Sequence, residues 1–414
     1  MLRKLTFATL SLTVLTVLLP AIQAQNVVTD WTAIASQTII HNAQKPPAAG
    51  TIFFAYAAIA SYDAVNAIDR RHEPFYYTDK APKKASQDAA ALAAAHAVLV
   101  YYFPTQQSSL DSAYATSLAA IGGSPSSKSD GVAVGEAAAA ALIAARTGDG
   151  LEANVPYTPG SGPGVWQPTP PAYAPAAVPW VGQMRPFTMK NADQFLPPGP
   201  PSLSSSQWQR DYIITATLGA ANGSPRTPTQ TEIGLFYTET PGQQYARAFI
   251  YLAIAQHLNV AESSRLMAML WTGGADATIG CWNAKYHYNF WRPVTAIPVG
   301  GGNSELTADP SWSAEAATPP HPEYPSAHSC FTTALASVIE GYFGTPNVHF
   351  VIDSLAFTPA HTHVFDNIRD LPEEVFWARI YTGFHYYNSL KDGAALGQGV
   401  ARQLLKNNFR PRND

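Results

Sequence analysis

Three short stretches in the second half of the chain hold side chains that suit the binding of an oxyanion. The first is "NAKYHYNFWRPV", in which Lys285 and Arg292 are seven residues apart. On a helix of about 3.6 residues per turn these cations point in nearly the same direction, roughly 10 Å apart along the axis. Their long side chains can converge on one small anion. Taken alone, the stretch is explained more simply by a solvated helix whose cationic stems cover aromatic neighbours.

The second stretch is "HPEYPSAHSCFTTALASVIEGYF", in which Pro325, Ser326, Ala327 and His328 precede a long apolar run. Proline and serine at this place indicate the start of a helix, where free backbone N–H groups attract anions. The alternative is that Ser326 only caps the helix and that His328 has no chemical role.

The third stretch is "FWARIYTGFHYYNSLKDG", with Arg379 and His385 six residues apart. Residues at this spacing are about 120° out of phase on a regular helix, so the pair shares a site only if the arginine side chain wraps or the helix ends near His385. Together, the three stretches supply what a tetrahedral oxyanion needs. Cations and N–H groups neutralise its oxygens, one imidazole bonds the central atom, and the other moves a proton.

Helices are expected to position these residues. From about residue 46 to 149 the chain is rich in alanine, which predicts helices packed closely through small side chains. Residues 150–205 carry many of the 34 prolines and cannot be helical, but their aromatic residues predict an ordered wrap over the helical body. The expected anchors of this wrap are Trp166, Tyr173, Trp180 and Phe187. Helical segments return in 206–414, and the predicted fold class is all-α.

The ends and the composition of the chain limit its location and its partners. Residues 1–24 have a basic start, a short apolar run and small residues near Ala24, which predicts a signal peptide and a secreted or periplasmic protein whose first helical part spans residues 25–149. No later stretch is expected to span a membrane, so no membrane anchor is predicted. The net charge of −4 gives no reason to expect nucleic acid as a partner. A homo-oligomer is left open.

The order Lys-x6-Arg-Pro, Pro-Ser-x-His, Arg-x5-His resembles the signature of the type 2 phosphatidic acid phosphatase and vanadium haloperoxidase superfamily. Four more stretches, "SYDAVNAI", "GVWQPTPP", "RTPTQTEIGLFY" and "DGAALGQGVA", are similar to the secreted bacterial haloperoxidase-like branch, so the resemblance covers most of the mature chain. It implies an all-helical fold built around four-helix bundles. It also implies a vanadate cofactor.

The resemblance assigns a role to each residue of the three stretches. It implies that His385 ligates vanadate and that His328 is the acid-base histidine. The cofactor oxygens would be held by Lys285, Arg292, Arg379, Ser326 and the backbone N–H of Ala327. Lys285 would also polarise the bound peroxide.

Three further residues are expected beside the site by resemblance. Trp282 matches a tryptophan that is common beside the lysine in haloperoxidases, and Glu239 matches an acidic group that supports the acid-base histidine. His321 stands where chloroperoxidases of the family tend to have Phe and bromoperoxidases His. The expected halide is therefore bromide or iodide.

Two positions depart from the family pattern. The family usually has Gly where this chain has Ala327, and a methyl group there narrows the pocket. Phosphatases of the superfamily usually place Asp four residues after the second histidine, where this chain has Ser389, and the nearest carboxylate is Asp392. A nucleophilic histidine needs its other nitrogen fixed by an acceptor, so this departure weakens a phosphatase reading.

The leading prediction is a haloperoxidase that uses hydrogen peroxide and halide to make hypohalous acid for an organic acceptor. One alternative is a phosphohydrolase with His385 as its nucleophile. Another is an idle oxyanion-binding or structural helical protein. A metal site on His361 and His363 is a further alternative, but the His-x-His pair is its only support. A solvated loop explains this pair better.

Two cysteines, Cys281 and Cys330, flank residues that must meet around one anion. They are expected to lie near each other. Whether they form a disulfide is left open, although an oxidising compartment would permit one.

Overall fold

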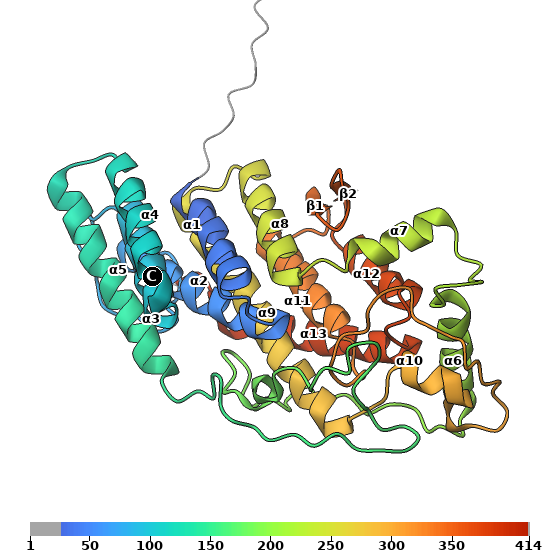
Figure 1. Cartoon of the computed structure of the whole chain (residues 1–414). Helices are drawn as coiled ribbons and strands as arrows, with labels where there is room; N and C mark the ends of the chain where they lie inside the picture. Colours follow the sequence, from blue (N-terminus) through green and yellow to red (C-terminus); the bar gives the residue numbers. More distant parts are fainter. Residues whose placement is uncertain (1–25, 413–414) are drawn as a thin grey trace, which may run out of the picture.

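The computed structural model describes residues 26–412, so the predicted leader lies outside the described residues. Within that range the chain forms thirteen α-helices and one small β-hairpin, which confirms the predicted all-α class (Figure 1). The first five α-helices are α1 (Val27–Ser36), α2 (Pro47–Asp69), α3 (Gln87–Tyr102), α4 (Gln107–Ala120) and α5 (Pro125–Arg146). A π-helical turn, η1 (Gln37–Asn42), follows α1, and a 3-10 turn, η2 (Pro104–Gln106), precedes α4.

Small residues bring α3 and α5 into close contact, as the alanine-rich composition predicted. A Cβ atom added at Gly131 would lie 2.4 Å from the carbonyl oxygen of Ser86, and one at Gly135 would lie 2.4 Å from that of Ala90. Real Cβ atoms do not approach a carbonyl so closely. The two glycines therefore set the spacing of these helices.

Helix α2 differs from the expectation that no later stretch could span a membrane. It is the one helix in the described part of the chain that is long and apolar enough to do so, and nearly all of it is buried inside the molecule. Its Phe54 ring stacks on Trp271 of α9 (Val260–Tyr288), with 4.1 Å between the ring centroids. The apolar character of α2 is thus explained by its place in the core.

The proline-rich segment is ordered and packs against the helices, as predicted. Trp166 and Trp180 are buried, and Phe187 is half-buried. Backbone N–H groups of Phe187 and Thr188 donate to the buried carboxylate of Asp276 on α9, each at 2.7 Å. The segment contains one 3-10 turn, η3 (Pro179–Gln183). The prediction for Tyr173 was wrong: its side chain is 65% exposed, at a position where the backbone has a positive φ of 48°.

The second half of the described chain contains the longest helix and the hairpin. Besides α9, its elements are α6 (Ser206–Leu218), α7 (Pro228–Phe236), α8 (Pro241–Ala255), α10 (Pro293–Ala296), the 3-10 turn η4 (Ile297–Gly302), α11 (Ala327–Phe343), α12 (Asp370–Tyr381), α13 (Tyr387–Asn407), β1 (Phe350–Ser354) and β2 (His361–Phe365). The two strands are antiparallel, with Phe350 opposite Phe365. Helix α9 lies between the two groups of helices (Figure 1).

Two glycines on α13 allow α11 to lie directly against it. A Cβ atom at Gly393 would be 2.8 Å from the carbonyl oxygen of Ser326, and one at Gly397 would be 2.2 Å from that of Cys330. This contact involves the first turn of α11, where the second of the three sequence stretches lies. The close approach therefore fixes the start of α11 relative to α13.

Candidate oxyanion site

Helix ends bring the three stretches together. Lys285 is in the last turn of α9. Asn289 directly follows this helix and adopts the left-handed conformation, with a φ of 51°. Arg292 is the residue before α10. Arg379 is in the last turn of α12, which stops at Tyr381. His385 lies in the short connection to α13. From the sequence, Arg379 and His385 could share a site if the helix ended near the histidine. Helix α12 does end there.

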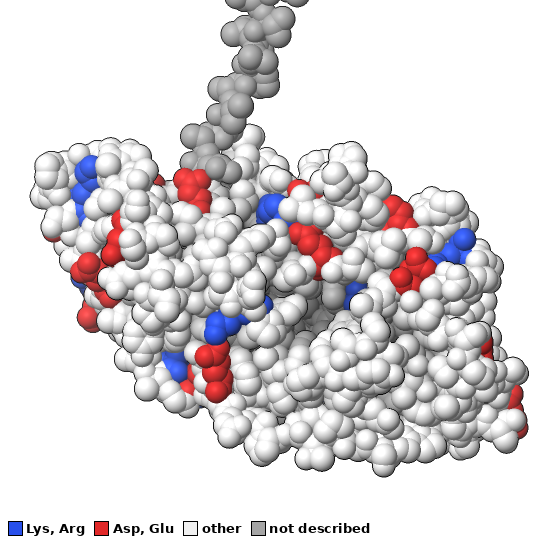
Figure 2. Space-filling view, viewed as in Figure 1, with Lys and Arg blue, Asp and Glu red and all other residues white. Residues whose placement is uncertain are grey.

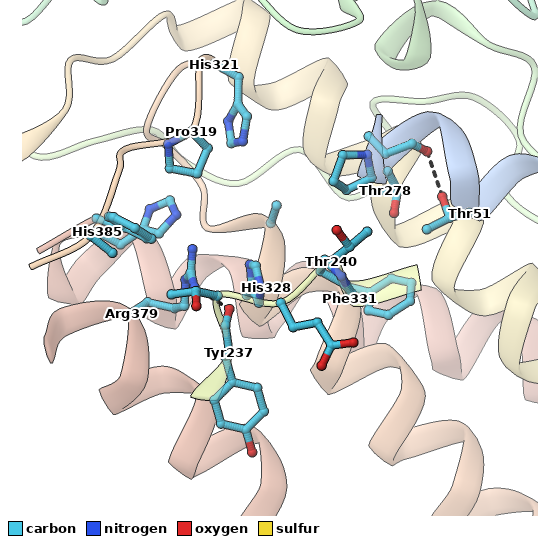
Figure 3. Close-up of a pocket in the computed structure, with 18 of the residues that line it drawn as sticks. Thr51, Tyr237, Thr240, Thr278, Pro319, His321, His328, Phe331, Arg379 and His385 are labelled. Atoms are coloured by element: carbon cyan, nitrogen blue, oxygen red, sulfur yellow. Dashed lines mark hydrogen bonds between the residues drawn. The ribbon is translucent and has the colours of Figure 1, made fainter. Parts of the chain in front are cut away.

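A cavity of about 450 Å³ opens at these helix ends. Figure 3 shows His385, Arg379 and His328 around it, with His321 on the opposite wall. The sequence-predicted residues that line it are Glu239, Trp282, His321, Ala327, His328, Arg379 and His385. The other three, Lys285, Arg292 and Ser326, are fully buried behind this lining. Figure 2 shows one face of the molecule, with a hollow in its middle that is surrounded mostly by uncharged residues.

The ammonium group of Lys285 holds the segment that precedes α11. It donates to the carbonyl oxygens of Pro322 at 2.8 Å and Glu323 at 2.9 Å. Burial, together with the charge of Arg292, lowers the pKa of Lys285 to about 8. An ammonium group has three protons, so one remains for a ligand.

Arg292 lies between two histidines and fixes the protonation of each. Its guanidinium donates to Nδ1 of His321 at 2.9 Å and to Nε2 of His385 at 3.2 Å. Burial lowers the pKa of Arg292 to about 10, which still leaves it charged at neutral pH. A guanidinium has no lone pair to offer, so both histidine nitrogens act as acceptors. The 3.2 Å contact of His321 Nδ1 with the Pro322 oxygen is then not a hydrogen bond, and His321 carries its proton on Nε2.

His385 receives its orientation from Glu323, which the sequence analysis missed. Nδ1 of His385 donates to Oε1 of Glu323 at 2.7 Å, and the same oxygen accepts the backbone N–H of Tyr386 at 3.0 Å. The family pattern places this carboxylate after His385. Glu323 instead comes from "HPEYPSAH", where its closeness in sequence to Ser326 and His328 was the available signal. Burial raises the pKa of Glu323 to about 7, against the attraction of Arg292 and Lys285.

Ser389 and Asp392, the two positions near His385 that the sequence analysis compared with the family pattern, have other contacts. Ser389 Oγ is 3.5 Å from Nδ1 of His385, a marginal distance. Asp392 accepts hydrogen bonds from Tyr324 and from Asn388. The acceptor that a reactive histidine needs is therefore supplied from a different segment of the chain.

Burial, with the charges of Arg292 and Lys285, lowers the pKa of His385 well below its ordinary value. The imidazole is thus neutral, with Nδ1 protonated and the lone pair on Nε2. In the structure this lone pair accepts from Arg292. It is the atom through which His385 can bind a metal or attack phosphorus.

His328 and Arg379 meet at the carbonyl oxygen of Tyr237. Arg379 donates to this oxygen at 3.0 Å, and the His328 imidazole also faces it. Burial, with the charge of Arg379, lowers the pKa of His328 well below its ordinary value. His328 is therefore a neutral group on the cavity wall that is able to accept a proton.

Glu239 lines the cavity, but its carboxylate is engaged elsewhere. It accepts from Arg247 at 2.8 and 2.9 Å and from the backbone N–H of Leu355 at 2.7 Å. Among the described residues the structure records no hydrogen bond between Glu239 and His328. Support of the acid-base histidine by Glu239 stays a prediction.

Within the described residues, two buried side-chain donors of the site, Ser326 Oγ and Arg379 Nε, have no protein partner, and the acceptor Glu323 Oε2 also has none. Ser326 precedes the first residue of α11, yet its side chain makes no capping hydrogen bond, so simple capping does not explain it. An unsatisfied buried donor costs about 1–3 kcal/mol. Arg379 lines the cavity together with His385, and Ser326 directly precedes the lining residue Ala327. A tetrahedral oxyanion fits this donor set, and vanadate is one such ion.

Comparison with known proteins agrees with this geometry. Residues 265–413 match the family model described as the VCPO second helical-bundle domain, and all three sequence stretches fall within this range. Over this range the chain is similar to a domain of the vanadium haloperoxidases. The resemblance inferred from the sequence is thereby confirmed.

One curated relative is the vanadium chloroperoxidase of Curvularia inaequalis, 25% identical over 198 residues. The match covers 40% of this chain and 32% of the relative, so the chain spans about a third of that protein's length. Among solved structures, a bacterial vanadium-dependent iodoperoxidase matches with a TM-score of 0.79 and 22% identity, covering 93% of this chain and 97% of the other. The holo form of a bacterial vanadium-dependent chloroperoxidase matches with a TM-score of 0.73 and 17% identity, with the same coverage. At these identities the structures show a shared fold.

The two cysteines lie close to each other, as predicted. Both are buried free thiols, and each lies close enough to the other to shift its pKa. Cys281 Sγ also lies 3.6 Å from the carbonyl oxygen of Pro325. The structure thus contains a thiol pair here and no disulfide.

The His-x-His pair forms ion pairs with carboxylates. Nδ1 of His361 contacts Glu232 at 2.8 Å, and Nδ1 of His363 contacts Glu374 at 2.7 Å. Within residues 26–412 no group of three or more His, Cys, Asp or Glu side chains is arranged to hold a metal ion. The pair connects the β-hairpin to α7 and α12.

Proposed function

We propose that this protein is a secreted vanadate-dependent haloperoxidase that oxidises bromide or iodide with hydrogen peroxide to hypohalous acid. The observation that carries the proposal is the pair of unpartnered donors, Ser326 Oγ and Arg379 Nε, beside the neutral Nε2 of His385. The match of residues 265–413 to the VCPO second helical-bundle domain supports the choice of vanadate over other oxyanions. When bound, vanadate supplies the activation of hydrogen peroxide towards attack by a halide.

The residues around His385 hold the anion and set its charge. Nε2 of His385 would bond the central atom, since Glu323 keeps the proton on Nδ1. The guanidinium of Arg292, which donates to Nε2 in this structure, would then turn its proton to an anion oxygen. Three buried cations, Lys285, Arg292 and Arg379, outnumber the buried carboxylate of Glu323, while Glu239 is paired with Arg247, and this balance favours an anion in a dry site.

The role that fits His328 is proton transfer. Its pKa lies well below the ordinary value because of burial and the charge of Arg379, so the imidazole is neutral and can take a proton from hydrogen peroxide. Its position on the cavity wall gives small molecules access to it. Ala327 precedes it, with its backbone N–H free at the first turn of α11 to reach the anion.

The role that fits His321 is halide binding. Its Nδ1 accepts from Arg292, so Nε2–H is the group left to donate into the cavity. The Trp282 ring lies 5.0 Å away, centroid to centroid. A large, polarisable halide suits a pocket with one N–H donor and an aromatic wall, in line with bromide or iodide.

A phosphohydrolase remains the second candidate because of one observation, the Glu323–His385 hydrogen bond. The sequence had weakened this candidate through the missing Asp after His385. The structure provides the required acceptor from Glu323, at 2.7 Å. The same pocket would accept phosphate, so phosphate should inhibit halide oxidation by competing for the oxyanion site.

Parallel assays distinguish the two candidates. The purified protein is stripped of anions, then supplied with vanadate, hydrogen peroxide and bromide, and halogenation of a phenolic probe is followed. A second sample is assayed for hydrolysis of p-nitrophenyl phosphate. Vanadate-dependent halogenation supports the haloperoxidase, whereas phosphatase activity without any halogenation would replace it by the phosphohydrolase.

A further inference from the structure

The cavity extends well beyond the oxyanion site. Figure 3 shows Arg379 and His385 towards one end, Thr51 and Thr278 at the other, and His328 between them. The volume of about 450 Å³ exceeds what hydrogen peroxide and a halide require, since one water takes about 30 Å³. Small-molecule sites commonly measure about 300–1,000 Å³. The far end thus has room for an additional ligand.

The wall at the far end combines apolar surface with two hydroxyl groups. Ala48 and Phe331 are among its apolar residues. The hydroxyl of Thr51 donates to the carbonyl oxygen of Ala48 and that of Thr278 to the carbonyl oxygen of Gly274, each at 2.8 Å. A hydroxyl has one proton and two acceptor positions. Both threonines therefore meet a ligand as hydrogen-bond acceptors.

Charge further restricts the ligand. Glu239, which lines the same cavity, is paired with Arg247, so its surroundings give no net attraction for an anion. An apolar wall with hydroxyl acceptors favours a neutral ring that carries an O–H or N–H donor. Phenols, indoles and similar electron-rich aromatic molecules have this combination.

We propose that the far end of the cavity binds the organic acceptor itself, an electron-rich aromatic molecule that donates an O–H or N–H to Thr51 or Thr278. The proposal rests on the proposed haloperoxidase function, which supplies the oxidant. Hypohalous acid formed at the other end reacts with an aromatic C–H: a carbon–halogen bond forms, the O–X bond breaks, and the ring proton leaves with hydroxide as water. Halogenation then occurs inside the protein and favours molecules that bind there.

Binding is tested without vanadate or peroxide, so the result does not depend on catalysis. Equilibrium dialysis measures the affinity of the full protein for 2-naphthol and for 2-methoxynaphthalene, which has a similar ring system but no donor. We expect 2-naphthol to bind more tightly. Thr51→Val and Thr278→Val keep the side-chain shape and remove the hydroxyl, and each should weaken 2-naphthol binding about threefold to tenfold, the scale of one hydrogen bond. Binding of 2-methoxynaphthalene should change little.

Thr116→Val is the matched control. The Thr116 hydroxyl donates to the carbonyl oxygen four residues earlier, as that of Thr278 does, but it lies on exposed α4 away from the cavity. This variant should bind 2-naphthol like the wild type. Equal affinity of the wild type for the two ligands, or unchanged 2-naphthol binding in both cavity variants, would overturn the proposal.

A competition assay adds the catalytic evidence. With both ligands present, the ratio of brominated products should favour 2-naphthol more than reagent hypobromous acid does, and the two cavity variants should return towards the reagent ratio. A wild-type ratio equal to that of the reagent would count against an acceptor site. Absence of any halide oxidation, with selective 2-naphthol binding retained, would refute the haloperoxidase assignment and leave an aromatic binding site.

Discussion

The protonation of His385 is determined by its two neighbours. Glu323 accepts the proton on Nδ1, and Arg292 donates to Nε2. His328, in contrast, faces the carbonyl oxygen of Tyr237 and has no carboxylate partner among the described residues. Two histidines in one cavity thus have different surroundings, and they should not be interchangeable.

Replacement of each histidine should separate binding from turnover. His385→Ala should abolish retention of vanadate, because the remaining contacts are hydrogen bonds and charge attraction to a hydrated anion. His328→Ala should still retain vanadate but lose turnover by on the order of 10²-fold or more, the usual scale for a positioned acid-base group. Equilibrium dialysis measures the first property and bromide oxidation the second. Full activity of His385→Ala would contradict the assignment.

Glu323 should act by positioning His385. Glu323→Ala removes the acceptor for Nδ1–H, and vanadate affinity should fall about 10–100-fold, as is typical when the partner of a ligating histidine is lost. Glu323→Gln keeps an acceptor oxygen and should restore part of this affinity. Vanadate titrations of the three proteins give the comparison. Equal losses in both variants would indicate that the negative charge matters and the orientation does not.

At the scale of elements, the β-hairpin connects helices that form the cavity wall. His363 on β2 contacts Glu232 of α7 at 3.2 Å and Glu374 of α12 at 2.7 Å. Its ring also stacks on Phe236, at 3.8 Å between centroids. Tyr237 directly follows α7, and Arg379 is on α12. The hairpin therefore helps to hold two residues of the site in place from outside the cavity.

The ion pairs of His363 should make stability depend on pH. Burial alone would lower the pKa of His363, but the hydrogen bond and charge of Glu374, with the charge of Glu232, raise it above its ordinary value. A raised folded-state pKa gives stability that is complete below about 6.5 and is lost as the pH rises through the folded-state value. His363→Gln should thus unfold at a lower temperature than the wild type at pH 6, with a smaller difference at pH 9. The expected loss at pH 6 is about 1 kcal/mol or less, since the group is partly exposed.

Thermal denaturation at both pH values measures this effect. His349→Gln is a suitable control. His349 directly precedes β1 and contacts Asp366, which directly follows β2, at an exposed position. The control should show little change at either pH. A destabilisation of His363→Gln that is the same at pH 6 and pH 9 would show that the stacking on Phe236 matters and the charge does not.

The proline-rich segment should resist proteolysis in the native protein. Its aromatic anchors Trp166 and Trp180 are buried, and Asp276 accepts three of its backbone N–H groups. Limited proteolysis followed by mass spectrometry should give few cuts within residues 150–205, with exposed Tyr173 the favoured place. Asp276→Asn, which weakens the acceptor, should increase cutting in this segment. Rapid cutting throughout the wild-type segment would contradict its close packing.

At the scale of the whole molecule, the oxyanion site joins α9, α11, α12 and the start of α13. An anion bound by Lys285, Arg379 and His385 would contact α9, α12 and the connection before α13, so it should stabilise the fold as a unit. At a concentration 100 times its Kd, vanadate should add about 2.7 kcal/mol to the free energy of unfolding. The melting temperature should rise with vanadate for the wild type and remain constant for His385→Ala. A similar rise in the variant would place the binding elsewhere.

Local spacing allowed much of this arrangement to be predicted. The helices, the proline-rich wrap and the residues of the three stretches follow from patterns within about 20 residues of sequence, where spacing fixes direction. Glu323 was not predicted as the partner of His385, because the two are 62 residues apart and only the packing of α11 against α13 brings them together. The hairpin was missed because each strand is only five residues long. Glu239 was linked to His328 by resemblance alone, and its strongest contacts are with Arg247.

The close contact of α11 with α13 gives the cavity one wall that resists redesign. No side chain fits at Gly393 or Gly397, so the start of α11, with Ser326 and His328, cannot be moved by substitutions that widen this interface. The opposite wall is different, because Ala48 and Thr51 are small side chains at the beginning of α2. A directed-evolution library that aims to change the size of the accepted molecule should therefore randomise the α2 wall and leave both glycines untouched.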